Sequence, residues 1–144
     1  MKAFYDKKPS KHFKRDVREF LKQFDVRVHF KQSGSCSAIE DKLIELDVRE
    51  LGTVQALWSC VFHELAHIYC WRNNLFEIYH KETLPPKKFA KYIRRNGVRI
   101  EKHVDKIGER LMKDYFPDIP FMGCYESAGD VRWYRTWVKR NYPL

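Results

Sequence analysis

The residues of this chain best suited to chemistry are two histidines, His63 and His67, with a carboxylate, Glu64, between them. On an α-helix, side chains four residues apart lie on one face, so both imidazoles can reach a single ion. Glu64 is turned from His63 by about 100° around the helix axis. From there its carboxylate can reach a water on the ion without binding the ion itself. Nitrogen ligands, an open coordination position and a nearby base are what zinc-dependent hydrolysis requires.

The residues around this motif predict the helix that it needs. Apolar residues recur with a helical period from Val54 to Tyr69, and Thr53 is a suitable N-cap. On a helix, the spacing H-E-x-x-H is a signature of zinc metallopeptidases. The sequence therefore predicts a metal site with His63 and His67 as ligands and Glu64 as the general base. Cys70, one turn after His67, is expected to be a buried cysteine rather than a ligand.

Length and composition limit the class of protein. A chain of 144 residues predicts one domain, residues 1–144, with a hydrophobic core. A hydrophobic content of 44% excludes a largely disordered chain. No apolar run approaches the roughly 20 residues of a membrane span, and the first residues lack the apolar segment of a signal peptide. We therefore expect a cytoplasmic protein with no membrane partner.

The charge and the cysteines add two weaker expectations. The formal net charge of +9 invites nucleic-acid binding, but the basic residues are scattered without a single stripe, and solvated helix faces are the preferred explanation. The cysteines form no C-x-x-C pair, so a zinc ribbon is not predicted.

The rest of the chain predicts an α+β fold, in which a small antiparallel sheet packs on the motif-bearing helix and several further helices. Strands are predicted by alternation and helices by apolar period, capping residues and prolines. The expected elements are a helix capped by Ser10, strands at 24–30 and 43–48, a short strand or loop at 36–41, and helices at 87–95, 98–115 and 130–140. Asn96-Gly97 is expected to end the helix at 87–95.

A catalytic zinc takes a third protein ligand and leaves one position for water. By residue type, the candidates downstream of the motif are His80, Glu101, His103 and Asp105.

One stretch of the chain resembles a known family. Residues 100–112, IEKHVDKIGERLM, resemble the second motif of the ImmA/IrrE-type metallopeptidases and the related small phage-encoded zincins. In those families the first Glu of an E-x-x-A/V-D helix is the third ligand, which implies Glu101 here, in a gluzincin-like site with one zinc per chain. The resemblance also implies that Asp105 orients one of the histidines. Gly108 indicates close packing of this helix on the zinc helix.

Other functions stay open at this point. A SprT-like protease acting on DNA-associated proteins would take its third ligand from His80, thirteen residues after His67, and would use the segment Trp133–Trp137 as a nucleic-acid surface. A non-enzymatic module that binds nucleic acid or protein would use zinc only to hold its fold. For a peptidase, Tyr125 or Tyr69 is a candidate donor to the oxyanion, and the substrate would be a protein or peptide.

Overall fold

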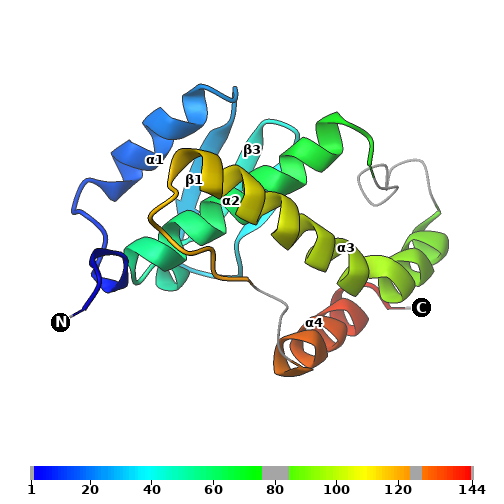
Figure 1. Cartoon of the computed structure of the whole chain (residues 1–144). Helices are drawn as coiled ribbons and strands as arrows, with labels where there is room; N and C mark the ends of the chain where they lie inside the picture. The colour runs from blue at the N-terminus through cyan, green and yellow to red at the C-terminus, as the bar shows by residue number, and fades with distance from the viewer. Residues whose placement is uncertain (1, 76–84, 124–127, 144) are drawn as a thin grey trace.

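The computed structural model describes residues 2–75, 85–123 and 128–143 of the chain (Figure 1). The predicted α+β class is confirmed: the described residues form a three-stranded sheet and four α-helices. The elements are η1 (Phe4–Asp6), α1 (Phe13–Lys22), β1 (Arg27–Lys31), β2 (Ser37–Glu40), β3 (Leu43–Asp47), η2 (Val48–Glu50), α2 (Val54–Arg72), α3 (Pro86–Tyr115) and α4 (Ala128–Asn141), where η marks a short 3-10 helix.

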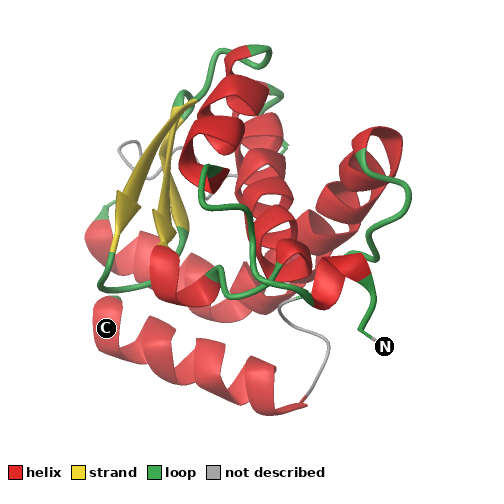
Figure 2. Cartoon of the chain, turned by 90° about the vertical axis from the view of Figure 1, so that its left-hand side faces the viewer, coloured by secondary structure: helices red, strands yellow, loops and turns green. Residues whose placement is uncertain are grey.

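The sheet is mixed, so the expected antiparallel sheet is wrong. The strand order is β1-β3-β2, with β1 parallel and β2 antiparallel to β3. The segment at 36–41 does form a strand, β2, and the chain turns directly from β2 into β3. β3 inserts between β1 and β2 because it is the most apolar strand, with Ile44 and Leu46 fully buried. Figure 2 shows the strands side by side along one side of the helices.

Helix α2 runs through the centre of the molecule and carries the H-E-x-x-H motif (Figure 1). Its predicted N-cap is confirmed, because the Thr53 hydroxyl accepts a hydrogen bond of 3.0 Å from the backbone N–H of Ala56. The helix is buried on most of its circumference, as expected for a helix that contacts the sheet and α3. Its apolar side chains form the main core with α1, β3 and the end of α3.

Helix α3 is continuous, so the expected break at Asn96-Gly97 is wrong. A glycine costs a helix interior only about 1 kcal/mol relative to alanine, and tertiary packing outweighs that penalty here. An added Cβ on Gly97 would overlap the Tyr134 hydroxyl of α4, so the absence of a side chain at Gly97 makes room for this tyrosine. α4 lies against the N-terminal half of α3 through Phe89, Ile93 and Val138 (Figure 1).

The remaining predicted helices and strands differ from the observed ones only in the residues at which they begin and end. α1 begins at Phe13 rather than next to Ser10, whose hydroxyl instead accepts from the backbone N–H of His12 at 3.1 Å. Among the described helices, none combines the length and the apolarity that a bilayer crossing requires.

Candidate metal centre

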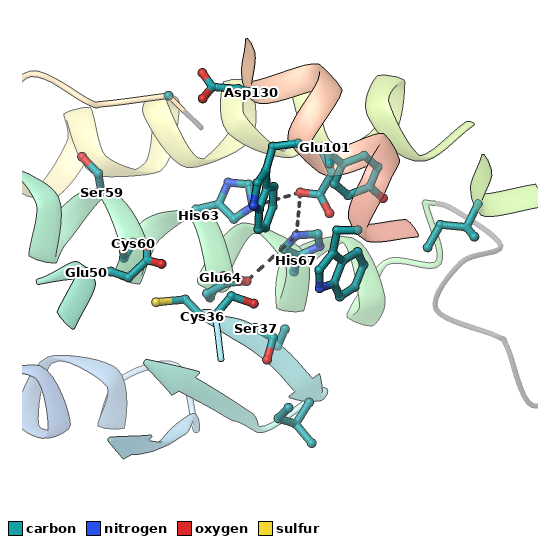
Figure 3. Close-up of a pocket in the computed structure, with 18 of the residues that line it drawn as sticks. Cys36, Ser37, Glu50, Ser59, Cys60, His63, Glu64, His67, Glu101 and Asp130 are labelled. Carbon is teal, nitrogen blue, oxygen red and sulfur yellow. Dashed lines mark hydrogen bonds and ion pairs between the residues drawn. The ribbon is translucent and has the colours of Figure 1, made fainter. Parts of the chain in front are cut away.

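Three side chains with metal-binding atoms converge where α2 and α3 cross. One potential ligand atom from each of His63, His67 and Glu101 lies within 4.8 Å of the other two, so the group could hold a metal ion. Oε2 of Glu101 lies 3.0 Å from Nε2 of His63 and 3.1 Å from Nε2 of His67. Figure 3 shows the Glu101 carboxylate reaching between the two imidazoles.

The crossing of the two helices decides which side chains meet. Gly108 of α3 lies against the backbone of α2, where an added Cβ would come within 3.1 Å of the carbonyl oxygen of Phe62. This close approach lets α3 bring Glu101, two helical turns earlier, over the residue that follows Phe62. The close packing that Gly108 indicates in the sequence is therefore what the structure has.

Asp105 binds the far side of the His63 ring. Its Oδ1 lies 2.7 Å from Nδ1 of His63, and both side chains are buried. An ionised carboxylate only accepts hydrogen bonds, so Nδ1 is the donor in this contact. In a neutral imidazole the lone pair is then on Nε2, the atom that faces Glu101 and His67. The arrangement of carboxylate, histidine and ligand position is the one that orients histidines in zinc sites.

Burial and charge act against each other on the ligand candidates. Burial lowers the pKa of His63, but its hydrogen bonds to Asp105 and Glu101 outweigh burial and hold the pKa well above its usual value. Burial raises the pKa of Glu101, but the nearby charge of His67 and the hydrogen bonds from His63 and His67 hold it far below its usual range. In the metal-free site the histidines thus balance the buried anionic carboxylate, a role that a bound cation would take over once the neutral imidazoles bind it.

Glu64 lies next to the potential metal ligands but is not one of the group His63, His67 and Glu101. Its side chain is buried, and its Oε1 lies 4.0 Å from Nε2 of His67. Burial raises the pKa of Glu64, while the charges of His63 and His67 oppose that rise. A carboxyl group whose pKa lies above its usual value is better matched to proton transfer near neutral pH than an exposed one.

A cavity of about 560 Å³ opens onto the site. One wall is the stretch from Ser35 to Ile39, which includes most of β2, and the other wall is α4. The α4 residues that line the cavity are Asp130, Trp133, Tyr134 and Trp137. From the sequence, the aromatic ones were considered only as a nucleic-acid surface, although their spacing of three and four residues already placed them on one helical face.

The other candidates from the sequence lie elsewhere. Cys70 is fully buried in an apolar cluster with Ala66 and Val104, as expected of a core cysteine. His103 is exposed on α3, outside the group of potential ligands. Tyr69 is 47% exposed and does not line the cavity. His80 and Tyr125 lie outside the described residues.

The donor set itself tests whether a metal fits. Two imidazole nitrogens and one carboxylate oxygen are a ligand set of catalytic zinc, with metal–ligand bonds of about 2.0–2.2 Å. A tetrahedron with such bonds separates its ligand atoms by about 3.4 Å. The carboxylate oxygen lies 3.0 and 3.1 Å from the two imidazole nitrogens, and all three atoms lie within 4.8 Å of one another. No family model, no curated protein and no solved structure matches the chain. The assignment of a metal centre therefore depends on this geometry.

Proposed function

We propose that the protein is a zinc-dependent metallopeptidase of the minimal, gluzincin-like type. The observation that carries this proposal is the convergence of His63, His67 and Glu101 within 4.8 Å beside the buried carboxylate of Glu64. We also propose that the chain is related to the ImmA/IrrE-type metallopeptidases. The positions of Glu101 beside both histidines and of Asp105 beside His63 support this, because the resemblance implies these two roles.

Each residue has a distinct role in this proposal. His63, His67 and Glu101 would hold the zinc, and Asp105 keeps the His63 ring oriented through its hydrogen bond to Nδ1. Zinc bound there would supply a Lewis acid that lowers the pKa of a water molecule and polarises a carbonyl group. Glu64 takes the proton from the attacking water and delivers it to the leaving nitrogen.

The edge strand on one wall of the cavity supports a peptide as the substrate. β2 is an edge strand of the described sheet, since it pairs with β3 on one side only, and it lines the cavity. An edge strand has unpaired backbone N–H and C=O groups that can pair with an extended peptide. A substrate chain bound along β2 would pass the metal site between β2 and α4.

The first test is zinc content, measured by elemental analysis of the purified protein and its variants. We expect about one zinc per chain in the wild type and in Glu109→Ala, a control at an exposed acid on the same helix. Glu101→Ala should lose zinc or bind it much more weakly. Retention in Glu101→Ala with loss in His80→Ala would contradict the ligand set and favour the SprT-like alternative.

The second test separates catalysis from metal binding. Glu64→Gln should keep its zinc, because Glu64 is not in the ligand group, but cleave an unfolded protein such as casein about 10²–10⁴-fold more slowly. Cleavage by the wild type should stop on chelation and return with zinc. A Glu64→Gln protein that cleaves at the wild-type rate would exclude this mechanism. If zinc is bound and needed only for folding, the non-enzymatic module would be the better description.

A further inference from the structure

Helix α4 has an aromatic face that the proposed chemistry does not use. Asp130, Trp133, Tyr134 and Trp137 follow one another at intervals of three, one and three residues, which places them on one face of the helix. All four line the cavity that also contains the metal ligand candidates.

These aromatic residues differ in burial, and the difference separates anchoring from binding. Tyr134 is 4% exposed and fixes α4 to α3 at Gly97. Trp137 is half-buried and stacks on Tyr134, with ring centroids 6.1 Å apart and planes at 28°. Trp133 is 55% exposed, so it contributes little to the core although it is one of the largest apolar side chains in the chain. An exposed indole beside a candidate metal site is typical of a binding surface.

The opposite wall of the cavity also exposes an apolar side chain. Ile39 of β2 is 45% exposed, lines the cavity, and lies at the irregularity in the pairing of β2 with β3 between Ala38 and Glu40. The metal site therefore lies in a cavity with exposed apolar groups on both walls, one on an edge strand and one on a helix.

The charges that line the cavity oppose those of the whole chain. The formal net charge is +9, yet none of the described residues that line the cavity is Lys or Arg. Four of the described residues that line it are acidic: Glu50, Glu64, Glu101 and Asp130. The basic residues of α4 are exposed and do not line the cavity: Arg132, Arg135, Lys139 and Arg140. Even with zinc bound to Glu101, a phosphate backbone would meet Glu50 and Asp130 without the lysines and arginines on which nucleic-acid binding depends. The cavity therefore favours a neutral or basic occupant.

We infer that the cavity is a substrate site selective for a large apolar side chain, best an aromatic one. The side chain belongs to an extended, neutral or basic peptide that passes the metal site, and it packs against Trp133 and Trp137 of α4 and Ile39 of β2. This inference rests on the proposed peptidase function for its position next to the cleaved bond. The aromatic face of α4 is then a specificity surface of the active site.

Binding is tested apart from turnover, with zinc-loaded Glu64→Gln protein and calorimetry. The probes are blocked peptides Ac-Lys-Ala-Ala-Xaa-Ala-Ala-NH2 in which Xaa is Phe, Ala or Glu. Partial burial of the phenyl ring should make the Phe peptide bind about tenfold more tightly than the Ala peptide, and the Glu peptide should bind most weakly. Equal affinities for Phe and Ala, or no binding of any peptide, would overturn the inference.

Three variants in the Glu64→Gln background locate the effect. Trp133→Ala should bring the Phe-to-Ala affinity ratio close to one, and Ile39→Ser, on the opposite wall, should reduce it. Thr136→Ala is the matched control, because Thr136 is exposed on α4 and does not line the cavity. Far-UV circular dichroism checks that each variant is folded, which the exposure of Trp133 and Ile39 favours. An unchanged ratio in both Trp133→Ala and Ile39→Ser would overturn the inference.

A cleavage experiment keeps the two proposals separable. Wild-type protein is given a peptide library from a digested proteome, and the cleavage sites are sequenced. Cleavage with no preference for large apolar residues, or with a preference that Trp133→Ala leaves intact, would overturn the inference while the peptidase function stands. No cleavage, with selective binding of the Phe peptide retained, would remove the peptidase function and keep the selective site. Displacement of the Phe peptide by a 15-nucleotide oligo(dT) that needs Trp133 would assign the surface to nucleic acid instead.

Discussion

The contact between α2 and α3 has two ends that use opposite chemistry. At one end Phe62 of α2 stacks on Tyr115 of α3, with centroids 6.1 Å apart, and packs edge-on to Phe20 of α1 at 5.4 Å. At the other end His63, the next residue of α2, is hydrogen-bonded to Glu101 and Asp105. The stripe of α3 that contacts α2 carries Glu101 and Asp105 beside the apolar Ile100 and Val104, is bare at Gly108 and is apolar from there on.

The difference between the ends shows where stability comes from and where function is located. Burial of the aromatic rings favours the folded state whatever is bound. The polar end takes carboxylates and imidazoles out of water, and such groups recover that cost only through their partners. The aromatic end therefore holds the two helices in register, and the polar end depends on that register and gains most from a cation.

The largest effect is expected from breaking the aromatic end. Phe62 is fully buried, so Phe62→Ala should destabilise the metal-free protein by about 3–5 kcal/mol, through lost transfer energy and the cavity left behind. Urea unfolding of the metal-free protein measures this. Tyr69→Ala, at an exposed aromatic residue of the same helix, is the control and should change stability by less than about 0.5 kcal/mol. A similar loss of unfolding free energy in both variants would show that the aromatic end contributes no more to stability than an exposed position does.

Loading the polar end with metal should give the next largest effect. At a free zinc concentration about 100 times its Kd, the folded state gains about 2.7 kcal/mol, because the unfolded chain lacks the site. Thermal unfolding with and without zinc measures the gain as a rise in Tm. Glu101→Ala should lose most of this rise, whereas Glu109→Ala should keep it. An equal rise in Glu101→Ala and the wild type would place the zinc elsewhere.

A smaller effect is expected when the metal ligands stay and only their support changes. Asp105→Ala removes the acceptor of the His63 Nδ1–H, and zinc affinity should fall about 10–100-fold. Asp105→Asn retains a neutral acceptor and should lose less. Competition with a fluorescent zinc chelator gives the affinities, and Asp114→Ala, at an exposed acid of α3, is the control. If Asp105→Ala binds zinc as the wild type does, Asp105 does not support the site.

The smallest effect is expected at the junction between the two ends. Gly108→Ala gains about 1 kcal/mol of helix propensity, but its Cβ would lie 3.1 Å from a backbone oxygen of α2, which cannot move aside as a flexible side chain can. Overpacking of this kind costs about 1–3 kcal/mol, so we expect a net loss of about 1 kcal/mol together with weaker zinc binding. Urea unfolding and zinc competition on the same protein measure both. A variant that is more stable than the wild type and binds zinc with unchanged affinity would show that α2 and α3 have room for a methyl group at this position.

Much of the architecture followed from local signals. The α2 helix and its Thr53 cap, the α+β class and the α4 helix were all predicted from period and capping, because these are set by residues within a few positions of each other. The single helix α3 was not, since Asn96-Gly97 reads as a stop unless the Tyr134 hydroxyl that fills the space over Gly97 is known. The parallel pairing of β1 with β3 was missed for a similar reason, because alternation identifies a strand and not its neighbour.

The sequence by itself determined the pair of imidazoles and the adjacent carboxylate, because a helical turn fixes how side chains four residues apart are placed. It supplied several candidates for the third ligand, and the resemblance pointed to Glu101. Only the tertiary structure brought Glu101 to the histidines across 34 and 38 residues of chain, and only it turned the aromatic face of α4 toward the same cavity. The physical reason is that the meeting of distant residues is decided by how whole helices pack, here by the bare backbone at Gly108 and Gly97.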